Sequence, residues 1–193
     1  MADDQPAIER QSFFEILASF PSGVAIVTTT DEDDVPCGLT TTAVSSVSAD
    51  PPTLLICVDL TARTLPALRA TGRFVVNFMR AGRSELCLLF ASKREQKFDH
   101  VAWSRTDGGL PLLELDVLAW AECTTEQELR VGDHAVLIAR VDAGAVLSDR
   151  LAPLMYYRRS WGVWSPTQAP GTPESMRPIE VGARDLRWHG AEL

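Results

Sequence analysis

The chain has little basic charge for its size. Among its 193 residues, 18 lysines and arginines stand against 26 aspartates and glutamates, which gives a formal net charge of −8. This balance argues against a general nucleic-acid binder and against a protein held on an anionic membrane by charge. No apolar run approaches the ~20 residues that a membrane-spanning helix needs, and the polar first ten residues do not resemble a signal peptide. We therefore expect a cytoplasmic protein.

Cysteine and histidine are also scarce. The four cysteines form no Cys-x-x-Cys pair, and three histidines do not supply the usual spacing of a zinc site, so we expect no metal. Cys57 and Cys87 lie in apolar surroundings, which predicts buried free thiols in a reducing compartment. The chain also lacks a Gly-x-Gly-x-x-Gly fingerprint, which argues against a Rossmann dinucleotide-binding domain.

What the chain does have is a series of short β-type segments. Residues rich in β-branched or apolar side chains predict strands over 24–30, 53–58, 73–79 and 134–141, and residues 113–123 are expected to form a further strand. Short helices are expected over 12–20, with Ser12 as its cap, over 64–71, with Thr64 as its cap, and over 84–91. Few helices and no βαβ alternation favour a mainly β protein built on an antiparallel barrel.

The most distinctive stretch covers residues 38–52. Thr40, Thr41 and Thr42 are followed by three serines, and the apolar strand predicted over 53–58 comes directly afterwards. Hydroxyls and backbone amides of such a stretch can hold a polar or phosphorylated ligand. The alternative is an exposed strand rich in threonine and serine that ends in a turn, and the local pattern alone favours it. Residues 61–64 likewise suit either a phosphate at a helix start or simple N-capping by Thr64.

Taken in order, five segments resemble a known family. They are residues 20–28, residues 38–52, residues 61–64 with 74–79, the pair Lys97 and Phe98, and residues 132–134 with 153–158. Each motif is weak alone, but their order and spacing are similar to those of the short-chain flavin reductases, the reductase components of two-component flavin-dependent monooxygenases. The resemblance covers roughly residues 13–164.

The resemblance implies a split β-barrel of Greek-key topology, with flanking helices, that binds flavin in an FMN-binding type of fold. It implies a homodimer that uses NADH or NADPH to reduce FAD or FMN, with FAD slightly favoured, and passes diffusible reduced flavin to a partner monooxygenase. By the same resemblance the flavin edge would contact Thr40, Thr41, Thr42, Ala43 and Val44. The ribityl and phosphate end would contact Asp59, Leu60, Thr61, Thr64, Asn77, Phe78, Met79, Lys97 and Phe98, and the nicotinamide would lie near His134, Tyr157 and Arg158.

Several of these roles have a structural alternative. Lys97 would offset phosphate charge, but a lone lysine in a charged segment is usually solvated surface. His134 would contact the nicotinamide or relay a proton, but a histidine at a strand end is more often bonded to a carbonyl. The chemistry itself needs no side-chain nucleophile, because hydride transfer between two cofactors is carried by the cofactors.

Three other functions stay open at this point. The protein could retain its flavin and act on a dedicated substrate, it could bind flavin without catalysis, or it could be a structural barrel with no ligand. For domain organisation we expect a disordered segment over residues 1–10, one flavin-reductase-like domain over 11–164 and a proline-rich tail over 165–193.

Overall fold

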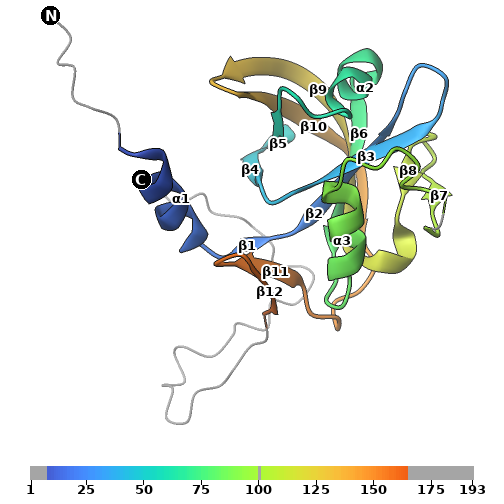
Figure 1. Ribbon diagram of the computed structural model, residues 1–193. Helices are drawn as coiled ribbons and strands as arrows, with labels where there is room; N and C mark the ends of the chain where they lie inside the picture. The colour runs from blue at the N-terminus through green and yellow to red at the C-terminus, as the bar shows by residue number, and fades with distance from the viewer. Residues whose placement is uncertain (1–7, 100, 165–193) are drawn as a thin grey trace, which may run out of the picture.

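The computed structural model describes residues 8–99 and 101–164, and the predicted tail lies outside them. Its main element is a seven-stranded antiparallel sheet of order β3-β2-β6-β9-β10-β5-β4 (Figure 1). The strands are β2 (Ala25–Thr30), β3 (Pro36–Thr41), β4 (Val44–Ala49), β5 (Pro52–Asp59), β6 (Arg73–Met79), β9 (Val117–Val131) and β10 (His134–Val146).

This sheet is rolled but not closed. Its two edge strands, β3 and β4, follow each other in the chain across only Thr42 and Ala43, and no ladder joins them among the described residues. At this bend the Cys57 amide donates to the Ala43 carbonyl, with N and O 3.1 Å apart. Strands β6, β9 and β10 lie side by side, and β10 returns beside the earlier strand β5, which is a Greek-key arrangement. The mainly β, split-barrel prediction is confirmed, with the split between β3 and β4.

The core lies inside the curve of the sheet, where alternate strand residues meet. In β5 the residues Leu54, Ile56 and Val58 are buried, while their neighbours are partly exposed. Val27 from β2 and Phe74 from β6 are fully buried in the same cluster. Burying each such side chain stabilises the fold by about 1.5–3 kcal/mol.

Two helices pack beside the sheet where the sequence predicts them. They are α2 (Leu65–Thr71) and α3 (Ser84–Ala91). Thr64 stands at the N-cap of α2 but makes no side-chain capping bond, and left-handed Gly72, with φ of 62°, ends the helix. Gly38 lets α3 approach β3: a Cβ there would lie 2.7 Å from the Val27 carbonyl oxygen and 3.0 Å from the Phe90 ring. The contact between α3 and β3 fixes one wall of the site described below.

The N-terminal helix differs from the prediction. Helix α1 (Arg10–Ala18) begins after Glu9, and Ser12 lies within its first turns, so the predicted Ser12 cap is wrong. The amide of Phe13 already donates to the Glu9 carbonyl, which starts the helix two residues earlier. Figure 1 shows α1 standing away from the main sheet, connected to it through β1 (Ser22–Gly23). Strand β1 pairs with β11 (Leu154–Tyr157), which pairs with β12 (Ser160–Val163).

The expected strand over 113–123 starts later than predicted. Residues Glu114–Asp116 form a 3₁₀ turn, η1, because the buried Leu113 donates its amide to the Asn77 side-chain oxygen and Asp116 pairs with Arg83. Strand β9 then continues to Val131, beyond the predicted end at residue 123. The turn to β10 is made by Gly132, with φ of 57°, and Asp133.

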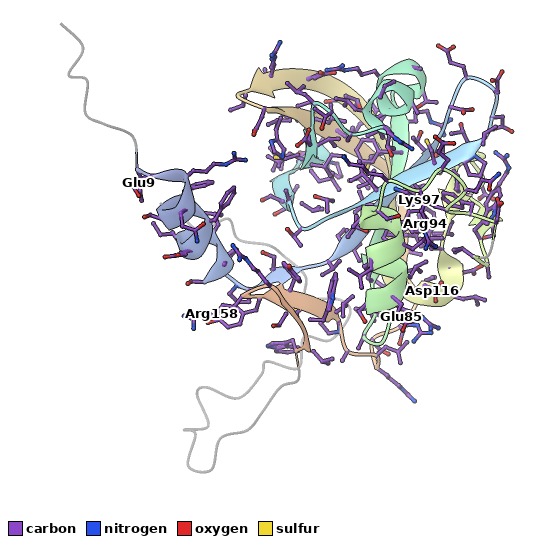
Figure 2. The ribbon with its side chains drawn as sticks, in the orientation of Figure 1. Glu9, Glu85, Arg94, Lys97, Asp116 and Arg158 are labelled. Atoms are coloured by element: carbon purple, nitrogen blue, oxygen red, sulfur yellow. The ribbon has the colours of Figure 1, made fainter. Side chains whose placement is uncertain are left out.

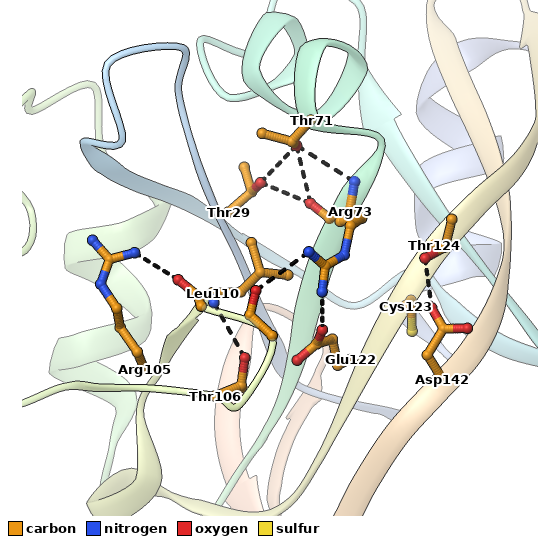
Figure 3. A network of polar contacts seen from close by, with 12 residues as sticks. Thr29, Thr71, Arg73, Arg105, Thr106, Leu110, Glu122, Cys123, Thr124 and Asp142 are labelled. Carbon is orange, nitrogen blue, oxygen red and sulfur yellow. Dashed lines mark hydrogen bonds and ion pairs between the residues drawn. The ribbon is translucent and has the colours of Figure 1, made fainter.

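A polar network ties the strands together on the side away from α1 (Figure 3). Arg73 pairs with the buried Glu122 of β9 and also donates to the Gly108 carbonyl in the loop between β7 (Ser104–Arg105) and β8 (Pro111–Leu112). The Thr29 hydroxyl donates to the Arg73 carbonyl, with the two oxygens 2.7 Å apart. Among the described residues, no helix has the length and apolar character needed to cross a membrane.

Candidate active site

A cleft of about 1040 Å³ opens along β3. Its walls are β3 with the Thr42–Ala43 bend, the end of β5 with the loop 59–64, and the end of α3 with the segment 92–99 that follows it; His134 also lines the cleft. This volume is at the upper end of the range for small-molecule and cofactor sites, about 300–1,000 Å³. The residues that the sequence places near a flavin and that line the cleft are Thr40, Thr41, Thr42, Ala43, Asp59, Thr61, Thr64, Lys97, Phe98 and His134.

The three threonines of β3 are not equivalent. The Thr40 hydroxyl donates to the Cys87 carbonyl of α3 at 2.6 Å, and the Thr41 hydroxyl accepts the amide of Ala43 at 3.0 Å. Both hydroxyls therefore already have a partner within the protein. Thr42 is exposed at the bend, and its hydroxyl has no protein partner within residues 8–99 and 101–164. It is therefore the threonine best placed to contact a ligand.

At the end of β5 the backbone is organised by a carboxylate. Asp59 accepts both the amide and the hydroxyl of Thr61, at 2.7 and 2.6 Å, and the hydroxyl and amide bonds from Thr61 lower the pKa of this carboxyl. Thr64 is buried, with 4% of its surface exposed. The loop is thus held in one shape, with Asp59 ionised at neutral pH.

Lys97 is the inner cation of the cleft. Its ammonium donates to the carbonyl of Gly38 on β3 at 3.1 Å and to the carbonyl of Phe90 on α3 at 2.7 Å. Burial lowers the pKa of Lys97. A lysine has three donors, so one remains for a ligand. Phe98 is buried beside it and packs edge-on against Phe90, with ring centres 5.1 Å apart.

His134 lies at the start of β10, opposite Asp59 in the pairing with β5. Its Nδ1 atom is 2.7 Å from the Asp133 carboxylate, so the partner is a carboxylate rather than the carbonyl that the sequence alternative suggested. The hydrogen bond from His134 lowers the pKa of Asp133. With Nδ1 engaged, Nε2 is the atom left to meet a ligand.

The other predicted site residues lie outside the cleft lining. Asn77 is fully buried, and its amide bonds to Ile26, Thr28 and Leu113 within the core. Tyr157 ends β11, and Arg158 begins the turn to β12, where its amide donates to the Ala18 carbonyl of α1. The remaining four, Val44, Leu60, Phe78 and Met79, pack against the two hydrophobic clusters. Their contacts with flavin or nicotinamide stay predictions.

The cleft also contains residues that the sequence did not single out. Arg63 lines the cleft. Its position between Thr61 and Thr64, inside a segment that resembles the family, could have identified it as a candidate. Lys93 and Arg94 line the cleft too. Cys37 faces the same space, and burial raises the pKa of its thiol to about 11, so it is protonated at neutral pH.

The cleft of this open barrel combines apolar surface with hydroxyl, carboxylate and cationic side chains, which suits a small-molecule or cofactor ligand. A family model described as a flavin reductase like domain matches residues 17–165. The chain therefore belongs to the flavin reductase-like family.

Individual relatives agree with this assignment. A flavin reductase (NADH) of Kitasatospora aureofaciens is 39% identical over 86% of this chain and 87% of its own length. A flavin reductase (NADPH) of Lentzea aerocolonigenes is 37% identical over 78% of this chain and 88% of its own length. The crystal structure of nitrilotriacetate monooxygenase component B from Mycobacterium thermoresistibile superimposes with a TM-score of 0.77 at 28% identity, covering 89% of this chain and 97% of that one.

Proposed function

We propose that this chain is an NAD(P)H:flavin oxidoreductase, one that reduces free flavin for a partner monooxygenase. The observation that carries the proposal is the cleft along β3, in which exposed Thr42, ordered loop 59–64 and inner cation Lys97 lie on different walls of one space. The family assignment and the names of the relatives support the same activity. We propose FAD as the flavin and NADH as the preferred reductant, within a single domain over residues 11–164.

The residues of the cleft fit a flavin. Hydroxyl and backbone groups at Thr41, Thr42 and Ala43 suit the carbonyl edge of a flavin ring, and Lys97 offers a partly buried positive charge to a phosphate. When bound, flavin accepts a hydride from a reduced nicotinamide, a step for which the cofactors supply the chemistry. The chain's own task is then to hold the ring at the open side of the barrel, with His134 fixed by Asp133 in the same cleft.

The partner proposal rests on the relatives. The similar structure from Mycobacterium thermoresistibile is named as a monooxygenase component, and we propose that this chain likewise supplies reduced flavin to an oxygenase. Transfer by diffusion needs no stable complex between the two proteins. A cytoplasmic location is supported by the four cysteines, all of which are free thiols.

Replacing Thr42 with leucine tests the flavin face of the cleft. We expect the dissociation constant for flavin to rise about tenfold, because the variant removes an unpaired hydroxyl and adds bulk at the bend. Isothermal titration with FMN and FAD measures this. Ser45→Leu is the matched control, since Ser45 is exposed on β4 and does not line the cleft. If a folded Thr42→Leu protein bound flavin as tightly as the unaltered chain, the Thr42–Ala43 bend would not be part of the flavin site.

Replacing His134 with alanine tests the nicotinamide role. We expect the KM for NADH to rise about tenfold while the affinity for flavin changes less than about twofold, because we assign the unengaged Nε2 of this cleft residue to the nicotinamide. Steady-state kinetics with varied NADH, alongside flavin titration, separates the two effects. The opposite pattern, weaker flavin binding with an unchanged KM for NADH, rejects the role.

We also propose that the chain forms a homodimer through α1. The apolar side chains Phe13, Ile16 and Leu17 follow the i, i+3, i+4 spacing of one face of α1, and Phe20 lies just beyond its end, yet each is exposed over 48% of its surface or more. Helix α1 has no buried residue of its own. A stripe of this kind, projecting from the barrel, suits burial against a second copy of the chain.

A further inference from the structure

The cations of the cleft lie at two depths. Lys97 is the inner one, held between β3 and the end of α3. Arg63, Lys93 and Arg94 are exposed around the mouth. Figure 2 shows Arg94 and Lys97 near each other, at the end of α3 opposite Glu85. A protein with a net charge of −8 thus gathers four positive side chains around one cleft.

Two of the walls meet through these cations. The Arg63 guanidinium donates to the Lys93 carbonyl at 2.8 Å, so the loop 59–64 touches the segment that follows α3. Burial lowers the pKa of Lys97 in the first place, and the nearby charge of Arg63 lowers it further. Like charges held this close repel each other, and an anion between them would relieve the repulsion.

Four carboxylates line the cleft beside the four cations: Asp31, Asp59 and Glu95 make bonds within the protein, and Asp99 is exposed. Asp59 is bonded by Thr61, and Asp31 accepts the amides of Asp33 and Val35 in its own turn. Glu95 pairs with Arg63 at 3.2 Å, but both side chains are largely exposed, so the pair is weak. Lys93 and Arg94 have no carboxylate partner among the described residues. The donors of Lys93 and Arg94 are therefore available to an anionic group of a ligand.

The cleft also extends beyond these outer cations. Val35 and Pro36 line it at the start of β3, whereas Thr42 lies just past the other end. A six-residue strand is about 20 Å long. The cleft thus has length and apolar surface left over once a ring near Thr42 and a phosphate near Lys97 are accommodated.

We propose that the outer cations Arg63, Lys93 and Arg94 bind the second phosphate of a flavin dinucleotide and so select FAD over FMN. Lys97 meets the phosphate that both flavins share, and the adenosine lies toward Val35 and Pro36. The inference rests on the proposed function, because it assigns specificity within the same site.

The test compares three ligands, FAD, FMN and riboflavin, by isothermal titration of the full chain. We expect Arg63→Gln and Arg94→Gln each to raise the Kd for FAD about tenfold, with changes below about twofold for FMN and riboflavin. Lys97→Gln should weaken FAD and FMN alike and riboflavin least. Arg69→Gln is the control: it removes the same charge from a similarly exposed arginine that pairs with Glu128 outside the cleft.

Arg94→Gln breaks no side-chain contact of the described residues, so it remains informative if Arg63→Gln fails to fold. If the Arg63 and Arg94 variants lost affinity for FAD and FMN equally, the outer cations would bind the phosphate that both flavins share. If their affinity for FAD were unchanged, the outer cations would not belong to the flavin site. Either result overturns the proposal. If the Arg63 and Arg94 variants raised only the KM for NADPH, these cations would bind the 2′-phosphate of NADPH instead, which would overturn the proposal. If the unaltered chain binds no flavin, the proposed function itself fails, whereas equal binding of FMN and FAD with normal turnover defeats only this inference.

Discussion

Asn77→Leu should lower the free energy of unfolding by about 3 kcal/mol. The Asn77 amide donates to the Ile26 carbonyl at 3.0 Å and to the Thr28 hydroxyl at 2.9 Å, and its oxygen accepts the Leu113 amide at 2.9 Å. Leucine has nearly the same size but leaves the Leu113 amide buried without a partner. Urea unfolding followed by circular dichroism measures the loss.

Gln127→Leu is the control for this change. It makes the same replacement of an amide by an aliphatic group on β9, but Gln127 is exposed, so we expect a change within about 0.5 kcal/mol. A stable Asn77→Leu protein that had lost its affinity for flavin would contradict the structural role. That result would support instead the flavin contact that the family resemblance implies.

The double variant Ile16→Glu, Leu17→Glu should convert the protein from dimer to monomer. Two carboxylates placed in the middle of the α1 stripe would have to be desolvated on association, at a cost that a single helix contact cannot offset. Sedimentation equilibrium should give twice the chain mass of 21.1 kDa before the change and the single chain mass after it.

The control for the dimer lies on the same helix. Gln11 is exposed and lies off the stripe, so Gln11→Lys should leave the dimer intact. A monomeric protein before any substitution would contradict the homodimer proposal. A double variant that remains dimeric would place the interface elsewhere.

The sequence predicted the barrel well because its strands carry local information. Residues 73–79 and 84–91 have the predicted bounds, since β-branched residues and an apolar helical pattern agree with what tertiary packing requires. The start of β9 was misplaced for a non-local reason. Alternation over 113–117 resembles a strand, but the bond from Leu113 to Asn77, 36 positions away, holds a 3₁₀ turn instead.

The site was predictable in outline only. The motifs brought Thr42, Lys97 and His134 to one cleft, although they are far apart in the sequence. Which threonine is free could not be predicted, because the partner of Thr40 is a carbonyl of α3 that reaches β3 only through packing at Gly38. Arg63 was missed because an arginine in a polar loop is ordinarily solvated surface.

The most direct test is anaerobic oxidation of NADH and NADPH with added FAD, FMN or riboflavin, followed by the loss of nicotinamide absorbance. We expect saturable, flavin-dependent turnover, fastest with NADH and with the lowest KM for FAD. Tight flavin binding without turnover in any combination would contradict the account and favour a protein that retains flavin for another substrate or binds it without catalysis.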